Sequence, residues 1–342
     1  MKKRKSTGEK DMSGLNTSNN FARRWVSYRS ELKVMDCTIR DGGLMNNHQF
    51  EDDIVKSVYQ ACADGGLDYM ELGYKGSGKV FSPSEYGAWK FCSEEDLRRV
   101  VGDHDTSLKL SVMADVGRTD YHNDILPKEH SVIDMIRVAC YIHQIPAAVD
   151  IIKDAHDKGY ETTLNLMAVS TVQESEIDGA LEMLAQSEVD VFYLVDSFGA
   201  LYSEQVHYLL RKYIQYAEPA GKTVGMHAHN NQQLAYANTI EAVITGANML
   251  DSSMAGLGRG AGNCPTELLM GFLHNPKYNL RPILECIQNH LVPLQEKLKW
   301  GYDIPYMITG LMNQHPRSAI KFNNSEDAGN IVKFFDQIEE EE

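Results

Sequence analysis

The sequence predicts an α/β protein built as a (β/α)8 barrel, with a small C-terminal helical domain. Eight short apolar or β-branched runs alternate with amphipathic segments of helical period over residues 32–275. No G-x-G-x-x-G follows the first run, which counts against the alternative of a doubly wound open sheet. A chain of 342 residues with 43% hydrophobic content is long and apolar enough for such a barrel and an appendage.

The expected elements follow in order along the chain. Residues 1–31 begin with basic MKKRKSTGEK and continue with polar residues where a signal peptide would have its apolar core, so we expect a flexible tail on a cytoplasmic protein. Proline-bearing HNPKYNLRP ends the eighth helix, and residues 276–342 are expected to form the helical domain, ending in acidic IEEEE. The expected barrel strands are 32–41, 67–74, 108–115, 134–143, 161–169, 189–197, 223–229 and 249–254.

Composition excludes two classes of function. A net charge of −15 argues against nucleic-acid binding, which needs a basic face. No apolar run approaches the roughly 18–20 residues that span a bilayer, so we expect no membrane segment. The six cysteines include no C-x-x-C pair, which favours reduced, buried thiols over a disulfide framework.

A pair of histidines gives the strongest indication of chemistry. His227 and His229 lie two residues apart at the end of the expected seventh strand, so both point to the same face. Asp41 is expected at the end of the first strand, and barrels carry their active sites where the strands end. One carboxylate and two imidazoles predict a catalytic metal site with open positions, and the lack of a thiolate favours Mn²⁺ or Mg²⁺. The alternative is that the histidines are hydrogen-bonded core residues and Asp41 a helix cap.

Other polar residues are expected around this site. Arg40 is a candidate for holding an anionic substrate oxygen, such as that of an enolate, and an ion pair with Glu71 or Asp115 is a compatible alternative. Glu71, His143 and Ser197 are placed near strand ends and are candidates for substrate binding.

The segment GLGRGAGNCP (256–265) lacks the phosphate-loop pattern and is expected to be a flexible cover over the substrate. In it, Asn263 is a candidate metal ligand or helix cap, and Cys264 is a packing thiol rather than a nucleophile. Neither Lys75 nor Lys79 explains the histidine pair, so a metal site is preferred to a Schiff base.

Four motifs strengthen this interpretation: DCTIRDG at 36–42, VDSFGA at 195–200, MHAHNN at 226–231 and AGLGRGAGN at 255–263. Over residues 32–275 the chain resembles the DRE-TIM metallolyases, also called the HMG-CoA lyase-like family, and within it the aldolases of 4-hydroxy-2-oxo acids. The resemblance implies that Asp41, His227 and His229 bind the metal, that Arg40 holds the enolate oxygen of pyruvate, and that Asn263 lies at or near the ion. LKWGYDIPY at 298–306 is similar to the segment through which such aldolases contact an aldehyde dehydrogenase partner.

One position departs from the family pattern. Three residues after the metal aspartate the aldolases carry a histidine base, and here that position is Leu44. His48, Tyr302, Tyr306 or His143 could replace the base.

We therefore expect a metal-dependent lyase that cleaves a 4-hydroxy-2-oxo acid to pyruvate and an aldehyde, in a homo-oligomer. The alternatives are a Claisen-type synthase that joins acetyl-CoA to a 2-keto acid, and a partner subunit that keeps the metal but not turnover.

Overall fold

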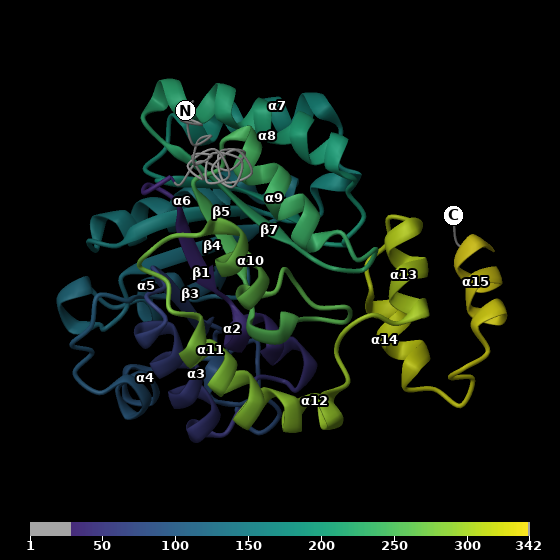
Figure 1. Cartoon of the computed structure of the whole chain (residues 1–342). Coiled ribbons are helices and arrows are strands. Elements are labelled where there is room, and N and C mark those ends of the chain that lie inside the picture. The colour runs from purple at the N-terminus through teal and green to yellow at the C-terminus, as the bar shows by residue number, and fades with distance from the viewer. Residues whose placement is uncertain (1–28, 341–342) are drawn as a thin grey trace, which may run out of the picture.

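In the computed structural model, which describes residues 29–340, the eight expected strands close into one parallel barrel (Figure 1). Each strand pairs with the next, and β8 completes the barrel by pairing with β1, where Val34 lies opposite Leu250. The predicted (β/α)8 barrel is confirmed. The strands are β1 (Lys33–Asp36), β2 (Tyr69–Tyr74), β3 (Lys109–Asp115), β4 (Met135–Cys140), β5 (Glu161–Leu166), β6 (Val191–Asp196), β7 (Thr223–Ala228) and β8 (Met249–Ser252). Residues 1–28 of the predicted tail, and 341–342, lie outside the described residues.

Helices form the outer layer, and apolar side chains such as Leu110 and Phe192 fill the space between helices and strands. Local signals set the helix ends: α4 begins after Ser93, whose hydroxyl accepts a hydrogen bond from the Asp96 N–H. The helices are α2 (Thr38–Gly42), α3 (Asp52–Asp64), α4 (Glu94–Val101), α5 (Tyr121–Asp124), α6 (Ile145–Asp157), α7 (Glu174–Ala185), α8 (Ser203–Ala217), α9 (Ala235–Thr245), α10 (Thr266–Leu273), α11 (Leu280–Cys286), α12 (Val292–Leu298), α13 (Ile304–Leu311), α14 (Arg317–Asn323) and α15 (Ile331–Glu340).

Inside the barrel, an apolar layer is overlain by a charged one. The apolar layer is a separate cluster that includes Tyr69, Met135 and Met249. Because side chains alternate between the two faces of a strand, the residues two positions further along β2, β4 and β8 also point inward. These residues are Glu71, Arg137 and Asp251, and all three are buried.

The first strand is shorter than predicted. It ends at Asp36 rather than at residue 41, and α2 follows almost at once. The Asp36 carboxylate favours this turn because it accepts hydrogen bonds from both the backbone N–H and the hydroxyl of Thr38, at 3.0 and 2.9 Å. Arg40 and Asp41 therefore lie on a short helix at the mouth of the barrel instead of at a strand end. The fourth strand likewise ends at Cys140 rather than at residue 143.

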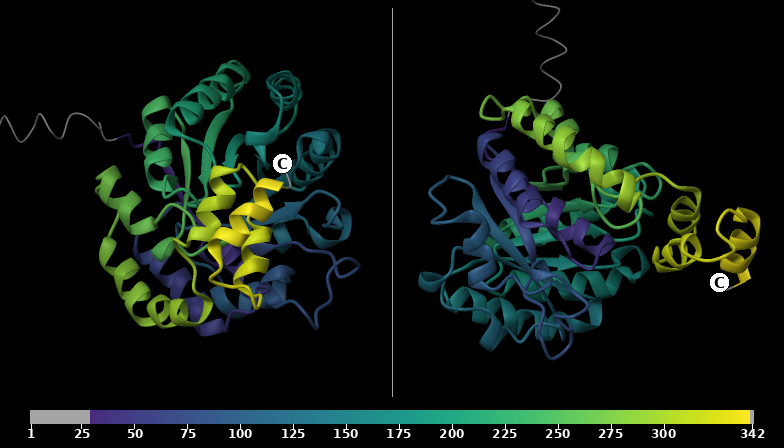
Figure 2. Two further views of the ribbon diagram at one scale, coloured as in Figure 1. Left: turned by 90° about the vertical axis from the view of Figure 1, so that its right-hand side faces the viewer. Right: turned by 90° about the horizontal axis from the view of Figure 1, so that it is seen from below.

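The C-terminal helices fall into two groups. Helix α11 packs against α3, and its Ile283 and Cys286 belong to the barrel's apolar core. Helices α13, α14 and α15 form a second cluster around Tyr306, Phe322 and Phe334. Figure 2 shows this second cluster standing at one end of the barrel. The predicted C-terminal helices are present, and a domain boundary at residue 276 stays a prediction.

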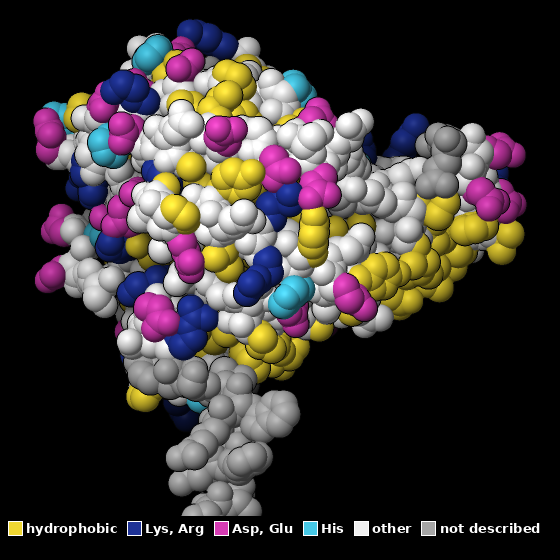
Figure 3. All heavy atoms as spheres, turned by 90° about the horizontal axis from the view of Figure 1, so that it is seen from above, with side chains coloured by type: hydrophobic (Ala, Val, Ile, Leu, Met, Phe, Trp, Pro, Cys, Tyr) yellow, Lys and Arg dark blue, Asp and Glu magenta, His cyan; other side chains and the backbone are white. Residues whose placement is uncertain are grey.

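Three further observations concern the exposed apolar side chains, the helices and the cysteines. Figure 3 shows hydrophobic side chains along the projecting C-terminal end, where Leu311, Val332 and Phe335 are exposed. Among the described helices, none is both long and apolar enough to cross a bilayer. All six cysteines are buried free thiols, as expected.

Candidate active site

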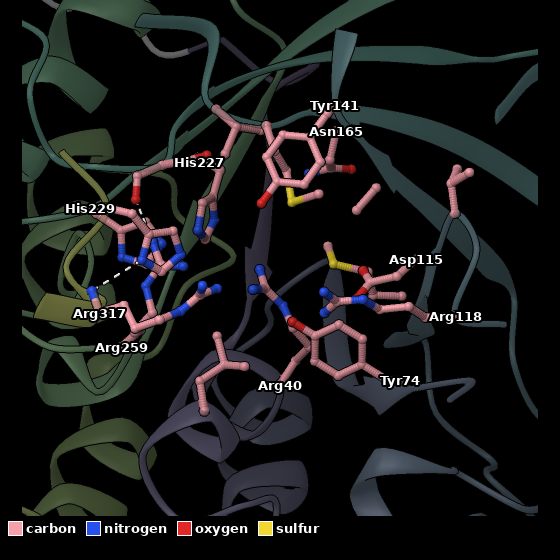
Figure 4. A pocket seen from close by; sticks show the side chains of 18 of the residues that line it. Arg40, Tyr74, Asp115, Arg118, Tyr141, Asn165, His227, His229, Arg259 and Arg317 are labelled. Atoms are coloured by element: carbon pink, nitrogen blue, oxygen red, sulfur yellow. Dashed lines mark hydrogen bonds between the residues drawn. The ribbon is translucent and has the colours of Figure 1, made fainter. Parts of the chain in front are cut away.

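A cavity of about 350 Å³ opens at the end of the barrel where the strands have their carboxyl termini. Its walls come from the loops after the strands and from the C-terminal segment, which contributes His315, Arg317 and Ile320. Figure 4 shows the labelled side chains converging on this space. Four of the predicted site residues line it: Arg40, Ser197, His227 and His229.

The three predicted metal ligands meet beneath the cavity. Ligand atoms of Asp41, His227 and His229 all lie within 4.8 Å of one another, and all three side chains are buried. From Oδ2 of Asp41, the Nε2 atom of His227 is 3.2 Å away and that of His229 is 3.8 Å away. This spacing places three donor atoms around one point, as a divalent ion requires.

The protonation states suit metal binding. Burial opposes ionisation of Asp41, but Arg40 together with His229 and His227 outweighs it and holds the pKa of Asp41 well below its usual value. Burial also holds the pKa of His229 well below its usual value, since the charged imidazolium is poorly solvated there. At neutral pH the site therefore presents a carboxylate and a neutral imidazole, the forms that bind metals.

Unpartnered polar atoms show that the residues fit an ion. Within residues 29–340, Nε2 of His227 and both amide atoms of Asn263 are buried without a hydrogen-bond partner. Buried polar atoms in native proteins are normally paired, so these atoms are suited to a bound group. The alternative role of Asn263 as a helix cap is wrong, because Pro265 occupies the cap position of α10. Asn263 instead forms an isolated bridge with His229.

Five charge-assisted hydrogen bonds and one 3.2 Å contact link six side chains at the site into a circuit. Arg40 donates to Asp41 at 2.7 Å and to Glu71 at 2.6 Å. Arg137 donates to Glu71 at 2.9 Å and to Asp251 at 2.6 Å. His227 Nδ1 lies 2.9 Å from Asp251, and its Nε2 faces Asp41, which closes the circuit.

This circuit fixes the orientation of two functional groups. The contact with Asp251 leaves Nε2 of His227 free to face the metal position, an outer-shell arrangement that orients metal-bound histidines. Two carboxylates hold Arg40 on the cavity wall, so the ion pair with Glu71 expected as an alternative is present. Glu71 itself does not line the cavity, and lies within β2 rather than at its end. Its contacts are with arginines and not with the space for substrate.

The candidates for a proton-accepting base lie elsewhere. None of His48, His143 and Tyr306 is among the residues that line the cavity. His48 is buried against Tyr74, His143 is exposed on the 3₁₀ turn after β4, and Tyr306 packs over Gly260 of the glycine-rich loop. Tyr302 is exposed. Leu44, in contrast, does line the cavity.

The glycine-rich loop is hydrogen-bonded to α2 and to the segment before α13. The backbone N–H of Arg259 donates to Asp41 at 2.9 Å, and Gly301 donates to Gly260 at 3.1 Å. Trp300 donates from its indole to Ala255 at 2.9 Å. The 298–306 segment thus contacts this protein's own active-site loop.

Several alternatives for cysteine and lysine are also settled by position. Burial raises the pKa of Cys264 to about 12, consistent with a packing thiol. Cys37 lies near His227 and Asp251, but the Arg137 guanidinium 3.6 Å from its sulfur disfavours a cation there. Lys75 donates to the Cys92 carbonyl at 2.7 Å, and Lys79 pairs with Asp120.

Sequence reasoning missed most of the charged residues around the cavity. Arg137 and Asp251 could have been found, because each follows an inward-facing methionine by two residues. The others, on loops and on the C-terminal segment, carry no comparable signal. They are Lys90, Arg118, Arg259 and Arg317.

Comparison with known proteins identifies the family of the chain. The sequence model of the HMGL-like family matches residues 31–288. The chain belongs to the HMGL-like family. A 4-hydroxy-2-oxovalerate aldolase of Pelotomaculum thermopropionicum is 30% identical over 274 residues, which cover 79% of this chain and 78% of the relative. An oxaloacetate decarboxylase of Mycobacterium tuberculosis is 27% identical over 249 residues, or 70% of this chain and 69% of the relative.

Solved structures share the barrel fold. The N-terminal domain of a proposed aldolase from Bacteroides vulgatus matches this HMGL-like protein with a TM-score of 0.75 and 28% identity, covering 88% of this chain and 99% of that one. The HMG-CoA lyase of Brucella melitensis matches with a TM-score of 0.63 and 17% identity, over 77% and 99% of the two chains, and shares the fold. The predicted family and the predicted class of enzyme, a lyase, are confirmed.

Proposed function

We propose that this HMGL-like protein is a divalent-metal-dependent aldolase that cleaves a 4-hydroxy-2-oxo acid into pyruvate and an aldehyde, or joins them in reverse. The observation that carries the proposal is the meeting of Asp41, His227 and His229 at one point beside Arg40. Relatives named 4-hydroxy-2-oxovalerate aldolase support the substrate class. Because the ligand set has no thiolate, Mn²⁺ or Mg²⁺ is the expected ion.

When bound by these three residues, with Asn263 beside them, the ion supplies Lewis-acid polarisation of the 2-oxo group. Arg40 provides the second stabilising group. Its Nε and Nη1 are held by Glu71 and Asp41, which leaves Nη2 to donate into the cavity. As the C3–C4 bond breaks, its electron pair moves toward the 2-oxo oxygen, and a donor already fixed beside that oxygen stabilises the enolate.

Cleavage also requires a group that takes the proton of the 4-hydroxyl. We assign this step to Asp115, which ends β3 and is the one carboxyl group among the described residues that line the cavity. Burial raises the pKa of Asp115, which makes its carboxylate a stronger base than an exposed one. Asp115 thereby compensates from the end of β3 for the loss of the family's histidine at Leu44.

Exchange of the methyl protons of pyruvate for deuterium tests the enolate part of the proposal without knowledge of the aldehyde. NMR should show exchange with Mn²⁺ present and none after addition of EDTA. Asp41→Asn and His227→Ala should lose both Mn²⁺ binding and exchange, whereas Arg40→Ala should keep Mn²⁺ and lose about 10²–10³-fold in rate. His122→Ala, on an exposed histidine, is the matched control. Full exchange by Arg40→Ala would contradict the enolate role.

Decarboxylation of oxaloacetate is a second candidate. Loss of CO₂ forms the same pyruvate enolate but needs no base, which suits a cavity with Leu44 at the position of the family's histidine. The relative named oxaloacetate decarboxylase also supports it. Asp115→Asn separates the two reactions, since it should stop aldol cleavage and leave decarboxylation, measured against the background rate with Mn²⁺ alone.

The assembly also belongs to the proposal. We infer a homo-oligomer and an aldehyde dehydrogenase partner from the family resemblance. Light scattering coupled to size-exclusion chromatography tests the first. The second is tested by transfer of the aldehyde product to an added dehydrogenase without release into solution.

A further inference from the structure

The cavity is far more positive than the protein around it. The whole chain has a net charge of −15, yet five cationic side chains and a single carboxyl group line the cavity. The carboxyl group is that of Asp115. The cations are Arg40, Lys90, Arg118, Arg259 and Arg317.

Four of these cations have no carboxylate partner. Arg40 is paired with Asp41 and Glu71, but none of the other four forms an ion pair within the described part of the chain. The Arg259 side chain donates only to the backbone carbonyl of Ser197, and its Nε is buried without a partner. The ammonium group of Lys90 lies 4.0 Å from the ring centroids of Tyr74 and Phe81. Lys90 and Arg259 are partly or fully removed from water without a carboxylate partner, which is costly and points to an anionic ligand beside them. Arg118 and Arg317 remain solvated and carry positive charge that no carboxylate of the described residues neutralises.

The five cations lie at different depths in the cavity. Lys90 is buried and Arg259 half-buried, whereas Arg118 and Arg317 are exposed at the rim. Figure 4 shows Arg118 on one side of the cavity and Arg317 on the other, with Arg40 between them. Arg118 follows β3 and Arg317 begins α14, so the C-terminal helices supply part of the rim.

Pyruvate cannot account for this charge. In the proposed function its enolate oxygen is held by Arg40 and the ion, and its carboxylate needs one further cation. The aldehyde of the relatives' named substrate, 4-hydroxy-2-oxovalerate, carries no charge. The rim cations are therefore left for the other reactant.

We propose that the aldehyde used by this protein carries a carboxylate or phosphate group at the end away from its carbonyl, bound by Arg118 and Arg317. This inference rests on the proposed function and narrows its substrate. In the condensation, the Asp115 carboxylate takes a methyl proton from pyruvate, and a bond forms between that carbon and the aldehyde carbon. The carbonyl π electrons of the aldehyde move to its oxygen, which takes the proton back from Asp115. The charged group takes no part in the bond changes and only positions the aldehyde.

Matched pairs of aldehydes test the inference. Condensation with pyruvate and Mn²⁺ is measured for glyceraldehyde 3-phosphate against glyceraldehyde, and for succinic semialdehyde against butanal. We expect kcat/KM for the charged member of one pair to exceed that of its neutral partner by at least about tenfold. The pair with the larger ratio identifies phosphate or carboxylate as the recognised group.

Variants then locate the recognition. Arg118→Gln and Arg317→Gln should each lower the ratio of charged to neutral kcat/KM several-fold. Arg281→Gln, on an exposed arginine of α11, is the matched control and should leave the ratio unchanged. A wild-type ratio near one, or a ratio unaffected by the two rim variants, overturns the inference.

A binding measurement separates this inference from the proposed function. Calorimetry on the metal-free protein with glycerol 3-phosphate and with glycerol asks whether the rim binds an anion without any turnover. Pyruvate exchange without anion binding or charge preference overturns only the inference. Anion binding without pyruvate exchange overturns the aldol function, and the assignment of the anion as an aldehyde falls with it.

Discussion

Replacing Arg137 with methionine should strongly destabilise the fold. The guanidinium is completely buried, donates to Glu71 at 2.9 Å and to Asp251 at 2.6 Å, and lies 4.4 Å from the centroid of the Tyr193 ring. Methionine keeps much of the volume but leaves two buried carboxylates without their shared cation. Removing one partner of a buried ion pair typically costs about 3–5 kcal/mol, and we expect a loss of that size in the free energy of unfolding.

Urea denaturation of the metal-free protein, followed by circular dichroism at pH 7, measures the loss. Arg98→Met is the matched control on an exposed arginine and should change stability by less than about 0.5 kcal/mol. Adding Glu71→Gln to Arg137→Met removes one of the two carboxylates that lose Arg137 as a partner, so the double variant should lose less than the sum of the single variants. Additive losses, or a loss below about 1 kcal/mol for Arg137→Met, would refute the argument that these charges act as a unit.

Three further outcomes are expected. Asp251→Asn should weaken Mn²⁺ binding about 10–100-fold in a titration followed by electron paramagnetic resonance, because His227 loses the carboxylate that orients it; unchanged affinity would contradict that role. Burial raises the pKa of Asp36 to about 6 from 3.8, so the folded protein favours the protonated form of this side chain. The free energy of unfolding should therefore fall by about 3 kcal/mol in total as the pH rises from about 4 to 7. Asp36→Asn should lack this part of the pH dependence in urea titrations. Burial lowers the pKa of Lys90 to about 8, yet sodium borohydride with pyruvate should add no mass to this lysine, and a pyruvyl adduct there would show Schiff-base chemistry instead.

The sequence was a good guide wherever a repeated pattern carried the information. The alternation of apolar runs with helical periods predicted all eight strands, and the two-residue spacing of His227 and His229 predicted their shared face. The sequence predicted that Asp41 lies beside these histidines, but it assigned Asp41 to the wrong secondary-structure element. Asp41 lies on α2 instead of a strand, but both positions are at the mouth of the barrel, so the error did not affect the site.

Prediction failed where a single side chain or a distant segment decided the geometry. His143 was assigned to the cavity by extending β4 by three residues, and those residues form a 3₁₀ turn that exposes it. Arg317 lines the cavity only because α14 stands across the barrel mouth, a tertiary contact that no local pattern encodes. Tyr306 was expected in the site but packs on Gly260 of the glycine-rich loop.

The charge balance of the buried circuit explains why one site holds so many ionised groups. Asp41, Glu71 and Asp251 carry three negative charges, and Arg40 and Arg137 carry two positive ones. Burial lowers the pKa of His227, but its contacts with Asp251 and Asp41 raise it by a larger amount, so an ion must displace a proton from His227. Once His227 is neutral, the circuit has one excess negative charge. A divalent cation at Asp41 converts that excess into a single positive charge. An oxo acid that binds there brings a carboxylate, and its enolate adds negative charge next to Arg40. The circuit therefore favours binding of the ion first and of the anionic substrate second. Because Arg40 and Arg137 are held by carboxylates on both sides, neither arginine can move to take the place of the ion or of the substrate.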